Sequence, residues 1–397
     1  MIILGSTGSI GCAALEIAKR FGKKVEALAA GRNIALLNKQ ILESAPAFVC
    51  IADEVDRAQL EPRGAKVFVG SEGICELLES AQSSLVINAI VGFAGLKPSL
   101  HTQKLGKTLA LANKESLVSG GWLLDTSKIL PIDSEHFGLW YLQSARVVKR
   151  LIITASGGAF RDAPLESIAT QSKSSALNHP NWKMGAKITI DSASMMNKIF
   201  EILEAFWLFG CKDVEAFIER SSSVHALIEF VDGSTTAHFA LPDMRLPIAY
   251  AIDAKKAAQS KILESMDLSQ ILNLTFAPID SARYPLYTLK DRLLSAPKLG
   301  VIVNASNEVA IAHFLADRIC FGAISEVVFD ALEAFAGEIG ESSENSEASA
   351  AKKSSDTSET KGANKTSALG DYDSIASLDA KVRAYCQEKM PLYAREV

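Results

Sequence analysis

MIILGSTGSIGCAALEIAKRF, residues 1–21, is the stretch that decides the fold class of this chain. The apolar run Ile2–Leu4 predicts a short buried strand, and Ile10–Phe21 predicts a helix. The glycines of Gly5–Gly11 permit a tight turn and a close approach of the backbone to a pyrophosphate at the helix N-terminus. A glycine turn without a nucleotide is the alternative, but the flanking strand and helix favour a dinucleotide site.

Strands and helices alternate through the rest of the first third of the chain. The strand candidates are Val25–Ala29, Phe48–Ile51, Lys66–Val69, Leu85–Val91, Thr108–Ala112 and Lys128–Ile132. Helical stretches such as Ala35–Ser44 separate most of them. This alternation predicts an α/β fold with a Rossmann-type, doubly wound parallel sheet, which we expect to be an NADPH-binding domain at residues 1–133.

The pattern changes after residue 133, where we expect a central α+β catalytic domain at residues 134–255. Val147–Thr154 and Lys187–Ile190 are predicted strands, joined by a long loop, residues 157–185, of a length typical of a functional loop. Asp232-Gly233 lies between two further apolar runs and predicts a hairpin.

The last part of the chain is expected to be a linker, residues 256–282, and a C-terminal helical domain, residues 283–397. Asn304–Ala316 and Glu326–Ala336 are its clearest predicted helices. Residues 342–367 hold only small, polar and charged side chains, so we expect a disordered insertion there, with a regulatory tail as the alternative. A folded pattern resumes at Tyr372–Met390.

Composition excludes several classes of protein. A net charge of −5 over 397 residues gives no basic field for nucleic acid. The six cysteines lack C-x-x-C spacing, which indicates reduced thiols in a cytoplasmic protein. We expect no signal peptide before MIIL and no membrane partner, since no apolar run approaches about 18 residues.

DSASMMNKIFEILEAFW, residues 191–207, carries a polar stripe on an otherwise apolar segment. If Ser192 opens a helix, the spacings of Asn197, Lys198, Glu201 and Glu204 put these four side chains on one face. Buried charges must be paired, hydrogen-bonded or bound to a metal. The alternative is a solvated helix face with Lys–Glu pairs.

Further polar groups follow the predicted strands. Asp133 and Glu135, two apart in an extended segment, should point the same way at the carboxyl edge of the sheet, unless they only cap the next helix. With Glu201 they make an oxygen-rich site suited to Mg²⁺ or Mn²⁺. Asn113-Lys114-Glu115 ends the neighbouring strand at the same edge, or is a plain surface turn.

Two further motifs belong to the long loop, one at its start and one within it. Ala155-Ser156-Gly157-Gly158 opens it with small residues that let a hydroxyl and amides face an anion. His179-Pro180-Asn181-Trp182 lies within it, and a tryptophan on such a segment predicts a lid that excludes water, or else packs on the core.

Together these motifs resemble the 1-deoxy-D-xylulose 5-phosphate reductoisomerases. The matching strings, in the family's order, are GSTGSIG, NKES, PIDSEH, SGGAFRD, HPNWKMG, DSASMMNK with Glu201, HALIEFVDGS, PDMRLPIAYA and NASNEVA. The resemblance implies a homodimeric enzyme. It would use NADPH and a divalent cation to convert 1-deoxy-D-xylulose 5-phosphate into 2-C-methyl-D-erythritol 4-phosphate on the non-mevalonate route to isoprenoid precursors.

The resemblance also implies roles for individual residues. The cofactor residues would be Thr7, Gly8, Ser9, Ile10, Gly31, Arg32, Asn33, Asn113, Glu115 and Gly185. The metal ligands would be Asp133, Glu135 and Glu201. The substrate residues would be Lys114, Ser134, Glu135, Ser156, His179, Ser192, Asn197, Lys198, Glu201 and Ser222. Lys114, Glu135 and Trp182 are the expected catalytic residues.

One departure bears on the phosphate site. The family has His-Pro-Gln-Ser where this chain has Glu219-Arg220-Ser221-Ser222, so Ser222 is kept and Arg220 adds a charge. Two other functions are compatible with a glycine-turn dinucleotide fold. A semialdehyde dehydrogenase would need an activated cysteine, which no motif supplies, and a non-catalytic NADPH sensor would have no need of the carboxylate trio.

Overall fold

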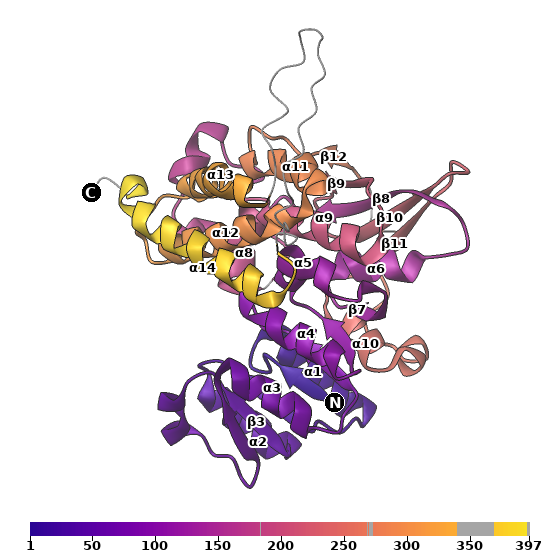
Figure 1. Ribbon diagram of the computed structural model, residues 1–397. Coiled ribbons are helices and arrows are strands. Elements are labelled where there is room, and N and C mark those ends of the chain that lie inside the picture. Colours follow the sequence, from indigo (N-terminus) through magenta and orange to yellow (C-terminus); the bar gives the residue numbers. More distant parts are fainter. Residues whose placement is uncertain (183, 268, 270–272, 340–368, 395–397) are drawn as a thin grey trace, which may run out of the picture.

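The computed structural model describes residues 1–182, 184–267, 269, 273–339 and 369–394. Its element order confirms the predicted fold class: a parallel sheet, a second sheet with helices, and C-terminal helices (Figure 1). The predicted insertion at 342–367 lies outside the described residues.

The N-terminal sheet is parallel throughout, with the strand order β4-β3-β2-β1-β5-β6-β7. Its strands are β1 (Ile2–Leu4), β2 (Ala27–Ala30), β3 (Phe48–Ile51), β4 (Lys66–Val69), β5 (Leu85–Asn88), β6 (Thr108–Leu111) and β7 (Ile129–Pro131). The helices that alternate with them are α1 (Ser9–Phe21), α2 (Ile34–Ser44), α3 (Gly70–Ser80), α4 (Leu96–Lys104), α5 (Lys114–Gly120) and α6 (Ser134–Leu142). The order reverses on the two sides of β1, so the carboxyl ends of β1 and β5 flank the crevice in which such sheets bind ligands.

The glycine turn after β1 is sterically required. Gly5 has a φ of +81°, and a Cβ there would lie 2.4 Å from the carbonyl oxygen of Ala89. A Cβ on Gly11 would lie 2.3 Å from the carbonyl oxygen of Gly5. Only glycine lets the turn approach β5 and α1 this closely.

The second sheet has the order β11-β10-β8-β9-β12 and mixes antiparallel pairs with one parallel pair, β8 with β9. Its strands are β8 (Val148–Ala155), β9 (Val214–Ile218), β10 (Val224–Phe230), β11 (Thr235–Phe239) and β12 (Ala277–Pro278). The crossover from β8 to β9 carries α7 (Lys173–Ala176), α8 (Ala186–Ala193) and α9 (Met196–Phe209). After the β10–β11 hairpin, α10 (Arg245–Ala258) returns to the first sheet, where Arg245 pairs with Glu16 of α1.

Two local predictions were wrong. Residues Lys187–Ile190 were expected to form a strand but lie in α8, where Lys187 pairs with Asp191 one turn later. Ser192 does not open a helix: it lies near the end of α8, and Met195, at φ 67°, separates α8 from α9. The long helix was therefore predicted three to four residues too early.

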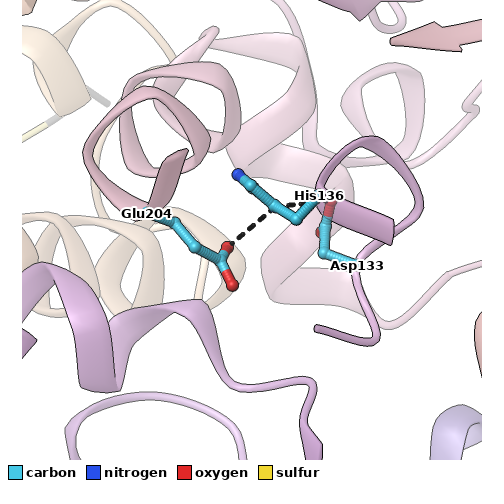
Figure 2. Close-up of side chains that lie close together, drawn as sticks. All are labelled: Asp133, His136 and Glu204. Atoms are coloured by element: carbon cyan, nitrogen blue, oxygen red, sulfur yellow. Dashed lines mark ion pairs between the residues drawn. The ribbon is translucent and has the colours of Figure 1, made fainter. Parts of the chain in front are cut away.

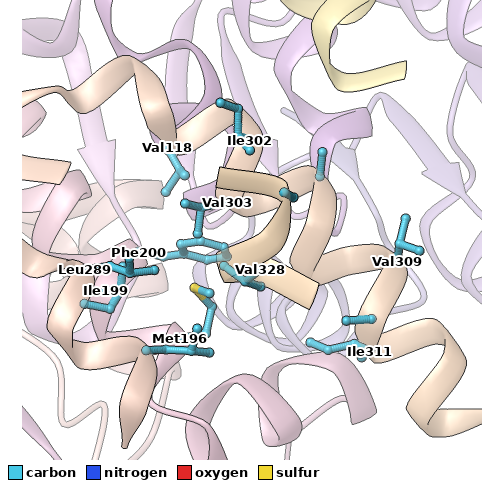
Figure 3. Close-up of a cluster of buried hydrophobic side chains, with 14 of the residues drawn as sticks. Val118, Met196, Ile199, Phe200, Leu289, Ile302, Val303, Val309, Ile311 and Val328 are labelled. Carbon is cyan, nitrogen blue, oxygen red and sulfur yellow. The ribbon is translucent and has the colours of Figure 1, made fainter. Parts of the chain in front are cut away.

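The largest core joins α9 to the C-terminal helices α11 (Lys290–Ser295), α12 (Gly300–Leu315), α13 (Ala323–Phe335) and α14 (Tyr372–Lys389). Phe200 of α9 is fully buried among Val118, Leu289, Val303 and Val328 (Figure 3). The apolar side chains of α9 are thus buried in this core and in the core under the second sheet, while its polar stripe faces α5 and α6. Among the described residues, no helix is long and apolar enough to cross a membrane.

Candidate active site

A cavity of about 710 Å³ lies between the carboxyl edge of the first sheet, the β8 end of the second sheet, and α8 and α9. A volume of this size is typical of cofactor and substrate sites. The predicted site residues that line it are Gly8, Ser9, Ile10, Asn113, Lys114, Glu115, Asp133, Ser134, Glu135, Ser156, His179, Trp182, Gly185, Ser192, Asn197, Lys198, Glu201 and Ser222. Thr7, Gly31, Arg32 and Asn33 lie outside that lining, next to the ends of β1 and β2.

The cofactor end of the cavity is built by loops that leave the parallel strands. Gly8 is the N-cap of α1, and it has no side chain that could accept from the first backbone N–H groups of the helix. Gly8, Ser9 and Ile10 line the cavity, so these N–H groups suit a phosphate bound there. Asn113 caps α5, and its Nδ2 donates to the carbonyl oxygen of Gly92, 2.9 Å away. Arg32 is exposed beyond the end of β2, where a cationic side chain suits the 2′-phosphate of NADP.

Three carboxylates meet at the centre of the site. Asp133, Glu135 and Glu201 each offer an oxygen, and these atoms lie within 4.8 Å of one another. Asp133 and Glu135 converge through the helix rather than through a strand pleat, because Asp133 caps α6 and accepts from the backbone N–H of Glu135. Asp133 therefore caps the helix, as the alternative interpretation predicted, and its carboxylate also converges with that of Glu135.

Two lysines neutralise part of this charge. Nζ of Lys114 donates to Oδ2 of Asp133 at 2.7 Å, to Oε1 of Glu201 at 2.8 Å and to Oδ1 of Asn197 at 2.9 Å. Nζ of Lys198 pairs with Glu201 and, at 3.0 Å, with Oε1 of Glu135. Burial alone would lower the pKa of Lys114, but Asp133 and Glu201 raise it well above its ordinary value.

The carboxylates still exceed what the lysines satisfy. Burial raises the pKa of Glu135 to about 7, and the neighbouring charge of Glu201 adds to this rise. An oxygen-only donor set with unrelieved negative charge fits a hard divalent cation such as Mg²⁺ or Mn²⁺.

A second group of polar side chains lies behind these carboxylates. His136 is fully buried between Asp133 and Glu204 (Figure 2). Its Nδ1 lies 3.3 Å from Oδ1 of Asp133 and 3.2 Å from Oε2 of Glu204. His136 and Glu204 were not among the site residues predicted from the sequence. His136 could have been found, because Asp133 caps a helix and a residue three positions later lies on the same helix face.

A cluster of two serine hydroxyls and a histidine lies at the other end of the cavity. Nε2 of His179 is 3.0 Å from Oγ of Ser156 and 3.1 Å from Oγ of Ser192. Nδ1 of His179 accepts from the backbone N–H groups of Asn181 and Trp182, so the proton of the neutral ring is on Nε2, facing the two hydroxyls. Burial, and then the charge of Arg161, lowers the pKa of His179 to about 4 and keeps the ring neutral.

Asn181 and Trp182, from the segment predicted to be a lid, line the same end of the cavity. Trp182 lies against His225, with 6.2 Å between ring centroids, and Nδ2 of Asn181 donates to Oγ of Ser222 at 2.7 Å. Asn181 belongs to the quoted His179–Trp182 motif but was not among the predicted site residues. Asn197 and Lys198, predicted to share a helix face with Glu201, line the same cavity and contact the carboxylate cluster.

The Glu219–Ser222 departure forms a self-contained turn. The carboxylate of Glu219 accepts from the backbone N–H groups of Ser221, Ser223 and Val224. The guanidinium of Arg220 binds both oxygens of Asp162 at 2.6 Å, outside the cavity lining. The charge of Arg220 is thus directed away from the cavity, while Ser222 lines it.

Comparisons with known proteins agree with this geometry. Sequence models described as 1-deoxy-D-xylulose 5-phosphate reductoisomerase, its C-terminal domain and the DXP reductoisomerase C-terminal domain match residues 1–121, 129–209 and 239–385. A protein of that name from Helicobacter pylori (strain P12) is 58% identical over 339 residues, which cover 85% of this chain and 92% of that protein. One from Wolinella succinogenes is 55% identical over 337 residues, covering 85% of this chain and 94% of that protein.

Solved structures give the same result. A crystal structure of DOX-P reductoisomerase in complex with NADPH, fosmidomycin and magnesium aligns with a TM-score of 0.85 at 32% identity, covering 98% of each chain. The 1-deoxy-D-xylulose 5-phosphate reductoisomerase from Zymomonas mobilis in complex with NADPH aligns with a TM-score of 0.79 at 31% identity and the same coverage.

Proposed function

The chain belongs to the family of 1-deoxy-D-xylulose 5-phosphate reductoisomerases, and from that premise we propose which residues bind the cation, the nucleotide and the substrate and which take part in the reaction. The protein is an NADPH-dependent oxidoreductase that uses a divalent cation to convert 1-deoxy-D-xylulose 5-phosphate into 2-C-methyl-D-erythritol 4-phosphate, in the non-mevalonate route to isoprenoid precursors. The observation that carries the assignment of roles is the convergence of Asp133, Glu135 and Glu201 in one cavity with the glycine turn and the serine–histidine anion site.

Asp133, Glu135 and Glu201 would hold the cation, and the first turn of α1 with Asn113, Glu115 and Gly185 would hold the nucleotide. When bound, the cation supplies Lewis-acid stabilisation of oxygen charge on the substrate, and NADPH supplies the hydride for the reduction. The remaining cofactor residues, Thr7, Gly31, Arg32 and Asn33, would hold the adenosine end beyond the cavity lining.

The substrate phosphate would lie at the serine–histidine end. The hydroxyls of Ser156, Ser192 and Ser222 can donate to its oxygens, and the Nε2–H of His179 is already directed at the first two. Asn197 and Lys198, which contact Glu201 in this structure, line the same cavity as the serines and would bind the phosphate from α9. Binding the phosphate away from the reacting carbons fixes their orientation.

Lys114 and Glu135 would act at the reacting carbons. The ammonium of Lys114 can neutralise charge on a substrate oxygen, and the carboxylate of Glu135, a cation ligand beside the substrate hydroxyls, is the candidate for proton transfer. The hydroxyl of Ser134 lies beside Glu135 and would contact the same hydroxyketone part. Trp182 would close the lid and exclude water.

Oxidation of NADPH, followed by the loss of its absorbance, tests the roles. With 1-deoxy-D-xylulose 5-phosphate and Mg²⁺ or Mn²⁺, the wild-type protein should turn over and form the branched erythritol phosphate. Glu201→Gln should abolish turnover and leave NADPH binding nearly unchanged. Turnover that survives in this variant would contradict the proposed metal ligands.

The homodimer and the cytoplasmic location are further proposals. The edge strand β11 ends the second sheet with Phe239 exposed, and Tyr141 of α6, which packs against His238 of the same strand, is also exposed. An unpaired edge with exposed aromatic side chains is a common protein contact. Light scattering after gel filtration would decide the oligomeric state, and a monomer at micromolar concentration would refute the dimer.

A further inference from the structure

The group of side chains behind the cation site has a geometry of its own. Asp133, His136 and Glu204 each place one ligand-type atom within 4.8 Å of the others. His136 is 0% exposed and Glu204 is 1% exposed (Figure 2). Neither residue lines the cavity, so neither touches a substrate held there.

The ring of His136 connects two elements that each supply a proposed metal ligand. Its Nε2 lies 2.8 Å from the backbone carbonyl oxygen of Glu201, and a carbonyl only accepts, so Nε2 carries a hydrogen. On its other side, Nδ1 lies 3.3 Å from Oδ1 of Asp133. One ring therefore connects two ligand-bearing elements: it makes an ion-pair contact with the side chain of Asp133, at the cap of α6, and a hydrogen bond with the main chain of Glu201, in the middle of α9.

Glu204 fixes that ring from behind. It lies one turn after Glu201 on α9, and its Oε2 is 3.2 Å from Nδ1 of His136. Burial raises the pKa of Glu204 to about 7, although the charge of His136 opposes this rise. A buried carboxylate is costly, and among its described neighbours His136 is the one with which it forms an ion pair.

We propose that Glu204 is a positioning residue: it orients the His136 ring, which in turn holds Asp133 and Glu201 at the spacing that a divalent cation requires. The arrangement follows the general rule that outer side chains orient the ligands of a metal. The inference rests on the proposed metal site and adds to it two residues that contact neither cation nor substrate.

The test is the affinity of the full-length, NADPH-saturated protein for Mn²⁺, with free Mn²⁺ measured by electron paramagnetic resonance. Glu204→Gln keeps the size of the side chain and removes its charge. We expect the Kd for Mn²⁺ to rise about 10- to 100-fold. The affinity for NADPH, measured by fluorescence, should stay within about twofold of the wild type, and the stoichiometry should stay at one Mn²⁺ per chain.

A matched control is Glu215→Gln. Glu215 is a half-buried carboxylate on β9 that accepts from Tyr287 at 2.9 Å and pairs with Lys290 at 2.9 Å, outside the cavity. This change should lower the unfolding temperature but leave the Mn²⁺ affinity unchanged. If Glu204→Gln behaves like Glu215→Gln, or if two Mn²⁺ ions bind per wild-type chain, the positioning role is overturned.

A double-mutant cycle shows whether Glu204 affects Mn²⁺ binding through His136 or independently of it. In a His136→Gln background, Glu204→Gln should weaken Mn²⁺ binding by less than about twofold further; full additivity would overturn the inference. Should Glu204→Gln fail to fold, Glu204→Asp, which withdraws the carboxylate from the ring, is expected to weaken Mn²⁺ binding in the same sense. Wild-type turnover with Mn²⁺ is measured alongside, because its absence would refute the proposed function rather than this inference.

Discussion

Replacing Lys114 with glutamine should weaken turnover and, at the same time, strengthen metal binding. The ammonium of Lys114 is held by Asp133 and Glu201, two of the proposed cation ligands, at 2.7 and 2.8 Å. It therefore competes with a cation for the same oxygens. Without it, the carboxylates lose one of their two lysine partners and repel one another more strongly.

The size of the effect follows from these distances. Carboxylate oxygens bind Mg²⁺ at about 2.1 Å, so a cation on the same oxygens lies no more than about 5 Å from Nζ of Lys114. A single and a double positive charge about 5 Å apart repel by about 7 kcal/mol at an effective dielectric constant of about 20. The flexible lysine can swing away and avoid most of this cost. If a fifth of it remains, the Lys114→Gln variant gains about 1.4 kcal/mol, or about tenfold in Mn²⁺ affinity.

The assay is a Mn²⁺ titration of wild type, Lys114→Gln and a control, Lys290→Gln, combined with thermal unfolding. Lys290 pairs with Glu215 outside the cavity, so its loss should not change Mn²⁺ affinity. Metal-free Lys114→Gln should be destabilised by about 3–5 kcal/mol, because it removes one cationic partner from buried carboxylates, and Mn²⁺ should restore more stability to it than to the wild type. Unchanged or weaker Mn²⁺ binding in Lys114→Gln would refute the competition between ammonium and cation.

Three further predictions concern the core, the pH dependence of stability and the lid. Phe200→Ala should lower the free energy of unfolding by about 3–5 kcal/mol, measured by urea denaturation, whereas Phe239→Ala, on the exposed edge strand, should change it little; equal effects would contradict the core assignment. Burial, and then the charge of His225, lowers the pKa of His238 from 6.5 to about 4. The unfolded chain therefore binds this proton more readily, and the stability present above about pH 6.5 should fall by about 2 kcal/mol by pH 5. His238→Phe should remove that part of the loss, and an unchanged pH dependence would count against it. Fosmidomycin binding should change the tryptophan fluorescence of the wild type but not that of Trp182→Phe; the same change in both would argue against the lid.

Much of the fold could be predicted from the sequence because its signals are local. The glycines at positions 5 and 11 are required by contacts within the first turn, and the alternation of strands and helices gave the parallel sheet. The meeting of Asp133 with Glu201 was also predictable, because a polar stripe on an apolar helix must be buried against partners. The convergence of Asp133 and Glu135 was predicted correctly but for a wrong reason, since Glu135 lies in a helix and not in an extended segment.

The failures have a different physical origin. AKITIDSA contains two isoleucines and a threonine, whose preference for strands was overridden by tertiary contacts. Within α8, Lys187 pairs with Glu115 at 2.6 Å and with Asp191 at 2.8 Å, and Asp191 accepts from Asn307 of α12. Similarly, the role of Glu204 depends on which face of α9 meets α6, which spacing along one segment does not determine.

The double use of α9 has a consequence for how the enzyme should respond to heat. The same helix supplies Glu201 to the site and Phe200 to the core shared with the C-terminal helices. Small losses of packing on the core side should therefore reach the ligand geometry before the whole chain unfolds. Conservative changes at Met196 or Val303, which do not line the cavity, are good starting points for conditional alleles: enzymes that work in the cold and stop at a temperature at which the protein is still folded.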